Sequence, residues 1–224
     1  MQLPALYVTG TDTGIGKTMA STALLHALRR QGRTAVGMKP VASGCENTPQ
    51  GWRNEDALAL QAASAPQPDY ATLNPYALPA PLAPELAAAD VGVTLALEPI
   101  AQAFAQLRAQ AEVVVVEGVG GWAAPLSAEL DQADLVRALT LPVVLVVGIR
   151  LGCINHARLT AAAIAADGLD CIGWIANEID PQMERIEENI GMLHQRLAMP
   201  CWGRIRWAPD ADAARQAQGL QLPA

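Results

Sequence analysis

The stretch that decides the fold reads LYVTGTDTGIGKT, residues 6–18. Its first four residues predict a short buried strand over 6–9. A glycine-rich segment follows, and behind it an apolar stripe at helical spacing predicts a helix that stops near Gly32. A strand, a loop ending in Gly16, Lys17 and Thr18, and a helix, in that order, are typical of a loop that holds the phosphates of a nucleoside triphosphate.

The residue types in this loop suit that task. Glycines let backbone N–H groups approach phosphate oxygens, and the following helix adds its positive end. Lys17 can reach the β- and γ-phosphates, and the Thr18 hydroxyl can ligate Mg²⁺. The spacing departs from strict G-x-x-x-x-G-K-T, because residues 11–15 separate Gly10 from Gly16. The alternative, a glycine turn that merely caps a helix, is disfavoured by the complete strand–loop–helix context.

The rest of the chain alternates between apolar strands and segments of helical length. Continuous apolar strands separated in this way indicate a parallel sheet covered on both faces. The predicted fold is therefore α/β: a single P-loop NTPase domain over residues 1–224, with a mostly parallel sheet and helices on both sides. Further strands are predicted at 34–38, 112–116, 142–147 and 171–176, and further helices at 55–63, 98–110, 130–139, 154–166 and 182–197. The proline-rich residues 66–84 are predicted to be a surface loop, and about 210–224 a poorly determined tail.

The composition narrows the functional class. A hydrophobic content of 51% is enough for a substantial core, and a net charge of −7 disfavours nucleic acid as a partner. We find no signal peptide and no apolar run long enough to span a bilayer, so no membrane partner is expected. The cysteines are scattered without a C-x-x-C pair, which suggests neither a zinc site nor a disulfide framework. A soluble enzyme of the reducing cytoplasm is the simplest interpretation.

Candidate site residues follow the predicted strands, where open α/β sheets bind ligands. Lys39 comes directly after the second strand and could be a second ammonium group near the phosphates. A solvated surface lysine is the alternative, but the chain has few lysines and this one follows a buried strand. Glu117 ends an apolar strand and could ligate Mg²⁺. An exposed strand-end carboxylate is common too, yet the glycines after Glu117 would let the backbone approach a ligand.

The roles of three further residues are not settled by the sequence. Asp56 begins a predicted helix, where metal binding and a favourable interaction with the helix dipole are about equally plausible. Asn177 could pair with an adenine edge or could be an ordinary turn residue at the end of a strand. His156 is interpreted as structural.

Four segments together resemble the dethiobiotin synthetase family: residues 10–18, 39–44, 117–122 and 151–156. The resemblance extends to about Pro209, and the expanded phosphate loop is itself typical of that family. It implies that 7,8-diaminononanoate, CO₂ and ATP give dethiobiotin, ADP and phosphate. It further implies Mg²⁺ as cofactor, a carbamate and a carbamic–phosphoric anhydride as intermediates, and a homodimer with active sites at the interface.

The resemblance also implies roles for particular residues. Catalysis would fall to Lys17 and Lys39, whose charges bring anionic carbamate and triphosphate together. Mg²⁺ would be held by Thr18, Asp56 and Glu117. The nucleotide would contact Gly14, Ile15, Gly16, Lys17, Thr18, Met19, Asp56, Glu117, Gly118, Val119, Gly120, Asn177, Glu178, Arg206, Trp207 and Ala208. The diamine substrate would contact Thr13, Ser43 and Gly120, and its carboxylate would meet Leu151, Gly152, Cys153, Ile154 and Asn155 of the neighbouring subunit.

Two positions depart from the family pattern. Arg150 stands where Lys is expected, so that a planar fork replaces a point charge. Arg206 stands where Pro is expected, beside the adenine. Two other functional classes share the fold: a nucleotide-driven switch of the partitioning or targeting type, and another amide- or urea-forming ligase such as a cobyrinate amidating domain. The first typically has an extra lysine early in the loop, where this chain has residues 11–13, and the second would need a glutaminase portion that is not apparent here.

Overall fold

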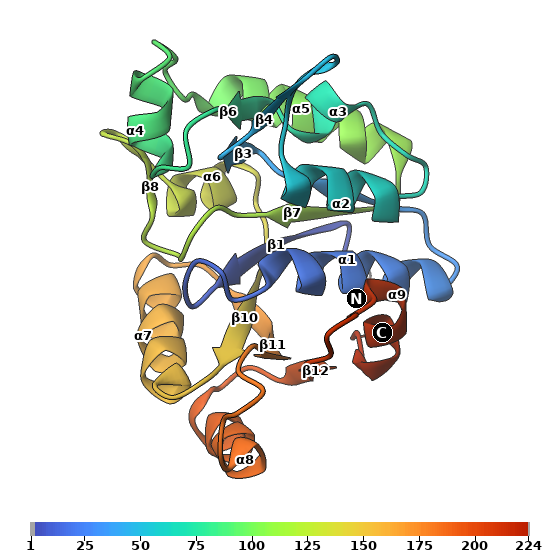
Figure 1. Ribbon diagram of the computed structural model, residues 1–224, viewed down its shortest axis with the longest axis vertical. Helices are drawn as coiled ribbons and strands as arrows, with labels where there is room; N and C mark the ends of the chain where they lie inside the picture. Colours follow the sequence, from blue (N-terminus) through green and yellow to red (C-terminus); the bar gives the residue numbers. More distant parts are fainter. Residues whose placement is uncertain (1–2, 224) are drawn as a thin grey trace.

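The centre of the molecule is a six-stranded sheet in which every neighbouring pair of strands is parallel. It is seen in a computed structural model that describes residues 3–223 (Figure 1). The strand order is β12-β11-β10-β1-β7-β2. The strands are β1 (Ala5–Gly10), β2 (Ala35–Met38), β7 (Val113–Glu117), β10 (Val143–Ile149), β11 (Cys171–Glu178) and β12 (Cys201–Ile205). The predicted α/β fold is thus confirmed, and the carboxyl ends of its strands meet at one edge.

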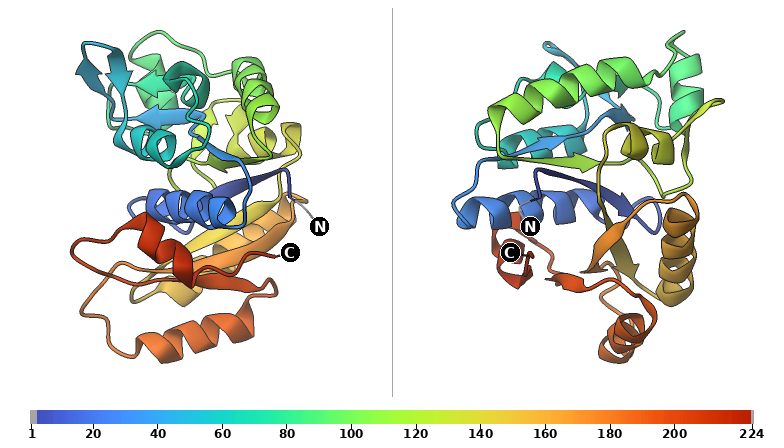
Figure 2. Two further views of the ribbon diagram at one scale, coloured as in Figure 1. Left: turned by 90° about the vertical axis from the view of Figure 1, so that its right-hand side faces the viewer. Right: turned by 180° about the vertical axis from the view of Figure 1, so that it is seen from behind.

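Helices cover both faces of the sheet (Figure 2). One face packs against α1 (Lys17–Arg30), α2 (Glu55–Ala63) and α9 (Ala213–Gln216), and the other against α5 (Leu97–Gln110), α6 (Gln132–Ala138), α7 (Cys153–Ala166) and α8 (Ile186–Arg196). The alternation of side chains along each strand explains this arrangement. In β1, Leu6 and Val8 face the α1 side while Ala5 and Tyr7 face the α5 side, and all four are buried.

The long predicted elements all exist, with modest shifts at their ends. The predicted helical stripe of α1 is buried, including Ala20, Leu24 and Leu28. The helix expected over 130–139 begins later, at Gln132, because Asp131 and Asp134 form a capping box there. The helix expected over 182–197 begins at Ile186.

The prediction of a plain loop over residues 66–84 is wrong in part. This region contains the helix α3 (Tyr70–Leu73) and the strand β6 (Tyr76–Leu78), which pairs in parallel with β3 (Val41–Ser43). Asp69 caps α3 through the N–H groups of Ala71 and Thr72, and Leu73 is fully buried. The prolines fall outside these elements, and Pro84 occupies the first turn of α4 (Pro84–Ala89), where proline is tolerated.

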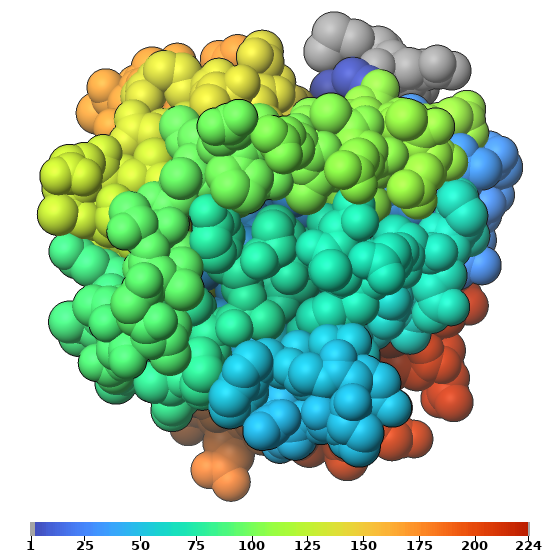
Figure 3. Space-filling view, turned by 90° about the horizontal axis from the view of Figure 1, so that it is seen from above, coloured from blue at the N-terminus to red at the C-terminus, as the bar shows by residue number. Residues whose placement is uncertain are grey.

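Two hairpins form small sheets of their own, apart from the six-stranded sheet. They are β4 (Glu46–Thr48) with β5 (Gly51–Arg53), and β8 (Pro125–Ser127) with β9 (Leu130–Asp131). In Figure 3 the segment from β4 to α4, coloured light blue to green, covers the surface beside α5.

The tail, in which the sequence indicated no element, is described up to residue 223, and Ala224 lies outside the described residues. After β12, which the sequence did not indicate, the chain forms α9 and a 3₁₀ turn, Ala217–Gly219. Ala217 and Leu220 lie in the core with α1, and the Gln221 N–H donates to the Trp202 carbonyl at 2.6 Å. The tail has too few apolar residues to show a helical or strand period in the sequence. These few residues are nevertheless enough to pack it against the surface of α1. Within residues 3–223, no helix combines the length and the apolar character that crossing a bilayer would require.

Candidate active site

The phosphate loop joins β1 to α1 and is braced from the neighbouring strand. Gly16 caps α1 with φ of 79°, and a Cβ at this position would overlap the Asn177 side-chain amide. Asn177 is buried at the end of β11, and its Nδ2 donates to the Ile15 carbonyl at 2.7 Å. Only glycine meets both requirements at position 16. Support of the loop by Asn177 was not anticipated, since the sequence gives no sign that this strand end lies beside residue 15.

The two lysines of the chain are both in this site. Lys17 and Lys39 are the only lysines in the sequence, and both are buried. The Lys17 ammonium group donates to the Asp12 carbonyl at 3.1 Å. Burial, reinforced by the nearby charge of Lys39, lowers the pKa of Lys17 to about 8.

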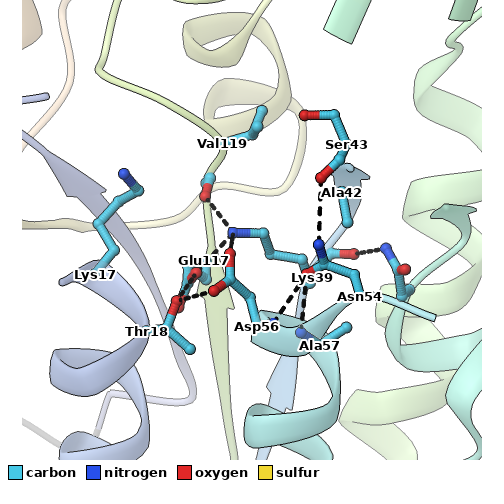
Figure 4. A network of polar contacts seen from close by, with 12 residues as sticks. Lys17, Thr18, Lys39, Ala42, Ser43, Asn54, Asp56, Ala57, Glu117 and Val119 are labelled. Atoms are coloured by element: carbon cyan, nitrogen blue, oxygen red, sulfur yellow. Dashed lines mark hydrogen bonds and ion pairs between the residues drawn. The ribbon is translucent and has the colours of Figure 1, made fainter. Parts of the chain in front are cut away.

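Lys39 is held by three oxygen atoms (Figure 4). Its Nζ lies 2.7 Å from Glu117 Oε1, 3.0 Å from Asp56 Oδ2 and 3.1 Å from the Gly118 carbonyl oxygen. Burial opposes the charge, but Glu117 and Asp56 outweigh that effect and raise the pKa of Lys39. With an exposed fraction of 3%, Lys39 is not the solvated surface lysine of the alternative interpretation.

Two carboxylates and a hydroxyl group meet beside Lys39. The Thr18 hydroxyl oxygen lies 2.7 Å from Asp56 Oδ1 and 2.9 Å from Glu117 Oε1. Asp56 also sits in the first turn of α2, behind the N-cap Asn54, so a role in the helix and a role in the site coexist. Burial favours the neutral form of Asp56, but Lys39 and the Thr18 hydroxyl keep its pKa below the usual value.

This donor set fits Mg²⁺. Mg²⁺ usually takes one or two protein carboxylates and completes its shell with water and substrate phosphates. The second carboxylate oxygen of Glu117, Oε2, is buried without a hydrogen-bond partner, and a hard cation or its water would satisfy it. Among residues 3–223, no three His, Cys, Asp or Glu side chains gather into a cluster that could hold a metal. Only a metal that relies largely on its substrate for ligands suits such a site.

A cavity of about 360 Å³ opens over these groups. It brings together most residues expected at the phosphate and substrate end, and adds Ala42 and Asn54, which were not singled out. Asn54 could have been found as the N-cap of α2, since its position before Glu55 and Asp56 is a helix-start signal. The lining comprises Thr13, Gly14, Gly16, Lys17, Thr18, Lys39, Ala42, Ser43, Asn54, Asp56, Val119 and Gly120.

Residues 151–155 lie away from this cavity. They lead into α7, with Gly152 as its N-cap, and none of them lines the cavity. Leu151 is 91% exposed, whereas Cys153 is buried. The preceding Arg150 bonds Asp12 through Nη2 and Oδ2 at 2.6 Å, which ties this loop to the phosphate loop.

The segment expected near the base is held from two sides. Glu178 bonds the Arg204 guanidinium group and accepts the Trp207 N–H at 3.2 Å. Gln216, in the tail, accepts the Arg206 N–H at 3.1 Å and donates to the Arg206 carbonyl at 2.9 Å. Trp207 remains 45% exposed and Ala208 is half-buried. The contribution of Gln216 was not predicted from the sequence.

Comparison with known proteins gives the same picture at the level of family and fold. Residues 4–215 match a family model described as an AAA domain. An ATP-dependent dethiobiotin synthetase BioD of Xanthomonas oryzae pv. oryzae (strain PXO99A) is 90% identical over 223 residues, 100% of both chains. One of Xylella fastidiosa (strain 9a5c) is 69% identical over 209 residues, 93% of this chain and 92% of that relative.

Among solved structures, the MinC:MinD cell division protein complex of Aquifex aeolicus aligns with a TM-score of 0.57 at 13% identity. The alignment covers 95% of this chain and 85% of that one. The signal recognition particle receptor FtsY of Elizabethkingia anophelis aligns with a TM-score of 0.56 at 15% identity, over 97% and 65%. At such identities the likeness shows the fold alone, which is that of a P-loop NTPase.

Proposed function

The chain belongs to the family of ATP-dependent dethiobiotin synthetases, ligases that form a carbon–nitrogen bond in biotin biosynthesis, and on this premise we propose that it converts 7,8-diaminononanoate, CO₂ and ATP into dethiobiotin, ADP and phosphate. The observation that carries the proposal is that both lysines, Thr18 and Asp56 line one cavity. Glu117 lies behind them and is bonded to Thr18 and Lys39. We also propose that it acts in the cytoplasm.

The nucleotide binds with its phosphates in the loop. Backbone N–H groups from Gly14 to Met19 face the phosphate oxygens, and the amino end of α1 adds its partial positive charge. Lys17, already at the loop, exchanges the Asp12 carbonyl for a phosphate oxygen. The base lies toward Asn177, Glu178 and residues 206–208. The Asn177 Nδ2 group donates to the Ile15 carbonyl, and its Oδ1 would accept from an adenine amino group.

The charges around the cavity explain why a divalent cation belongs in this reaction. The positive charges of Lys17 and Lys39 are balanced by the negative charges of Asp56 and Glu117, so these four side chains offer no net positive charge to a triphosphate. Mg²⁺ held by Thr18, Asp56 and Glu117 would neutralise charge on the β- and γ-phosphates.

The chemical steps require two anions to approach each other. One amine of the substrate captures CO₂ as a carbamate, losing a proton. A carbamate oxygen attacks the γ-phosphorus, the bond to ADP breaks, and a carbamic–phosphoric anhydride forms. The second amine attacks the carbonyl carbon of the anhydride and loses a proton, and the ring closes as phosphate leaves. Lys39 provides positive charge at a fixed place between carbamate and triphosphate, which is worth most where water is excluded.

The diamine is positioned by residues from two subunits. Thr13, Ser43 and Gly120, which line the cavity, contact the diamine and carbamate end. The substrate carboxylate reaches Leu151 to Asn155 of the neighbouring subunit in a homodimer. The amino end of α7 is a favourable place for a carboxylate, because its N–H groups are free of intrahelical partners.

A product assay tests this function. Purified protein receives diaminononanoate, bicarbonate, Mg²⁺ and ATP, and phosphate and the cyclic urea are measured together. We expect the two products in equal amounts, and little phosphate when the diamine is omitted. A switch ATPase would give a different result. It would release phosphate when the diamine is omitted, and it would form no cyclic urea when the diamine is present.

A further inference from the structure

The loop after β7, residues 118–124, shapes one wall of the cavity and also holds Lys39. The Gly118 carbonyl accepts from the Lys39 ammonium group at 3.1 Å. The same peptide unit continues into the Val119 N–H group, which faces the opposite way. The orientation of this one peptide therefore decides whether Lys39 keeps its third oxygen partner.

Gln132, at the start of α6, contacts this peptide and most of the loop. Its Oε1 accepts from the Val119 N–H at 3.2 Å and from the Tyr7 hydroxyl at 2.6 Å. Its Nε2 lies 2.6 Å from the carbonyl oxygen of Gly121 and 3.3 Å from those of Trp122 and Ala124. Because two donors surround one atom of the side-chain amide and three carbonyl oxygens surround the other, the first must be Oε1 and the second Nε2.

The hydrogen bonds of this network are shielded from water. Gln132 and Tyr7 are each 1% exposed, so a lost hydrogen bond would not be replaced by water. Burial, aided by Glu117, raises the pKa of Tyr7, which keeps the phenol protonated as a donor. The peptide also packs closely: a Cβ on Gly118 would overlap both the Tyr7 hydroxyl and Gln132 Oε1. The hydroxyl and the amide thus leave the Gly118–Val119 peptide little room to turn.

We propose that Gln132, oriented by Tyr7, is a positioning residue for Lys39: it fixes the Gly118–Val119 peptide so that the Gly118 carbonyl holds the ammonium group at the cavity. The inference rests on the proposed function of Lys39. Gln132 does not line the cavity and does not touch Lys39, so it acts through the peptide alone.

Three variants test it by kcat and by the Kd for ATP. Gln132→Met keeps the length of the side chain and removes all its hydrogen bonds, and we expect kcat to fall about tenfold or more, with the Kd for ATP within about threefold. Tyr7→Phe removes one hydroxyl group, keeps the ring and should lower kcat by about two- to fivefold. This second variant still tests the inference if Gln132→Met does not fold.

The control is Asp167→Ala. Asp167 accepts from the Trp122 Nε1–H group at 2.7 Å and so holds the same loop, without contact to the 118–119 peptide. Its kcat should stay within about twofold of the unmodified protein.

Combination with Lys39→Ala separates positioning from general damage. If Gln132 acts through Lys39, adding Gln132→Met to Lys39→Ala changes kcat by less than about twofold, because the group to be positioned is already gone. Losses that multiply would overturn the inference, as would an unchanged kcat in either single variant, Gln132→Met or Tyr7→Phe. If Lys39→Ala itself turned over at the normal rate, the proposed function of Lys39 would fail, which is a different result.

Discussion

Lys17 and Lys39 line the same cavity but differ in what surrounds their charges. Lys39 lies against Asp56 and Glu117, whose charges raise its pKa. Lys17 donates to the neutral Asp12 carbonyl, and burial lowers its pKa to about 8. Lys17 therefore loses its proton and its positive charge as pH rises through about 8 in the free protein. A bound triphosphate would restore it, because an adjacent anion favours the charged form.

The pair of lysines makes this directly measurable. Protein labelled with ¹⁵N-lysine should give two side-chain signals in NMR spectra, since the sequence has no other lysine. We expect one signal to titrate near pH 8 in the free protein and to lose that inflection when ATP is bound, while the other stays charged. Lys17→Met, recorded as the control, assigns the titrating signal. A Lys17 signal that remained charged above pH 10 in the free protein would contradict this description.

At the scale of elements, periodicity predicted the long strands and helices but not the short ones. The strand–loop–helix around residues 6–18 and the apolar strands identified the sheet, and the residues at the strand ends identified most of the cavity lining. The helix α3, the strand β6 and the tail after β12 were missed, because three or four residues cannot show a period. Gln132 and Gln216 were missed for another reason. A glutamine in an amphipathic segment looks like a solvated residue, and only the folded chain supplies its partners.

The docked tail predicts a specific loss of stability. Leu220 is 9% exposed and packs with the core on the α1 side. Leu220→Ala should lower the free energy of unfolding by about 2–3 kcal/mol, because it removes buried methyl groups and leaves a cavity. Urea denaturation monitored by circular dichroism measures this. Leu58→Ala, on an exposed position of α2, is the matched control and should change stability by less than about 0.5 kcal/mol. Equal stability of Leu220→Ala and the unmodified protein would mean that the tail does not belong to the core.

At the scale of the whole molecule, the two parts of the proposed substrate site do not meet within one chain. Lys39 and Ser43 line the cavity, while the loop before α7 does not. On that loop and helix, Leu151 is 91% and Leu159 62% exposed. In the proposed homodimer, a second copy of the chain would cover them, and Asn155 would be supplied to the neighbour's cavity.

Mixing two inactive variants tests whether each site is built from two subunits. Lys39→Ala and Asn155→Asp damage different halves of the proposed site, and each should have little activity alone. In a mixed dimer, one site would combine an intact Lys39 with an intact Asn155. After subunit exchange at equal concentrations, activity should recover to about a quarter of the unmodified level, since half of the dimers are mixed and each has one working site. Absence of recovery, with exchange verified by mass spectrometry, would place both residues in one subunit's site.

The central claim is that Lys39 supplies positive charge where the carbamate meets the γ-phosphate. The most direct test is the single-turnover rate of dethiobiotin formation by Lys39→Ala with saturating diaminononanoate, bicarbonate, Mg²⁺ and ATP. We predict a rate at least about 100-fold lower, with the Kd for ATP within about threefold of the unmodified protein, because the charge matters most in the transition state. A Lys39→Ala protein that forms dethiobiotin at the unmodified rate would contradict the claim.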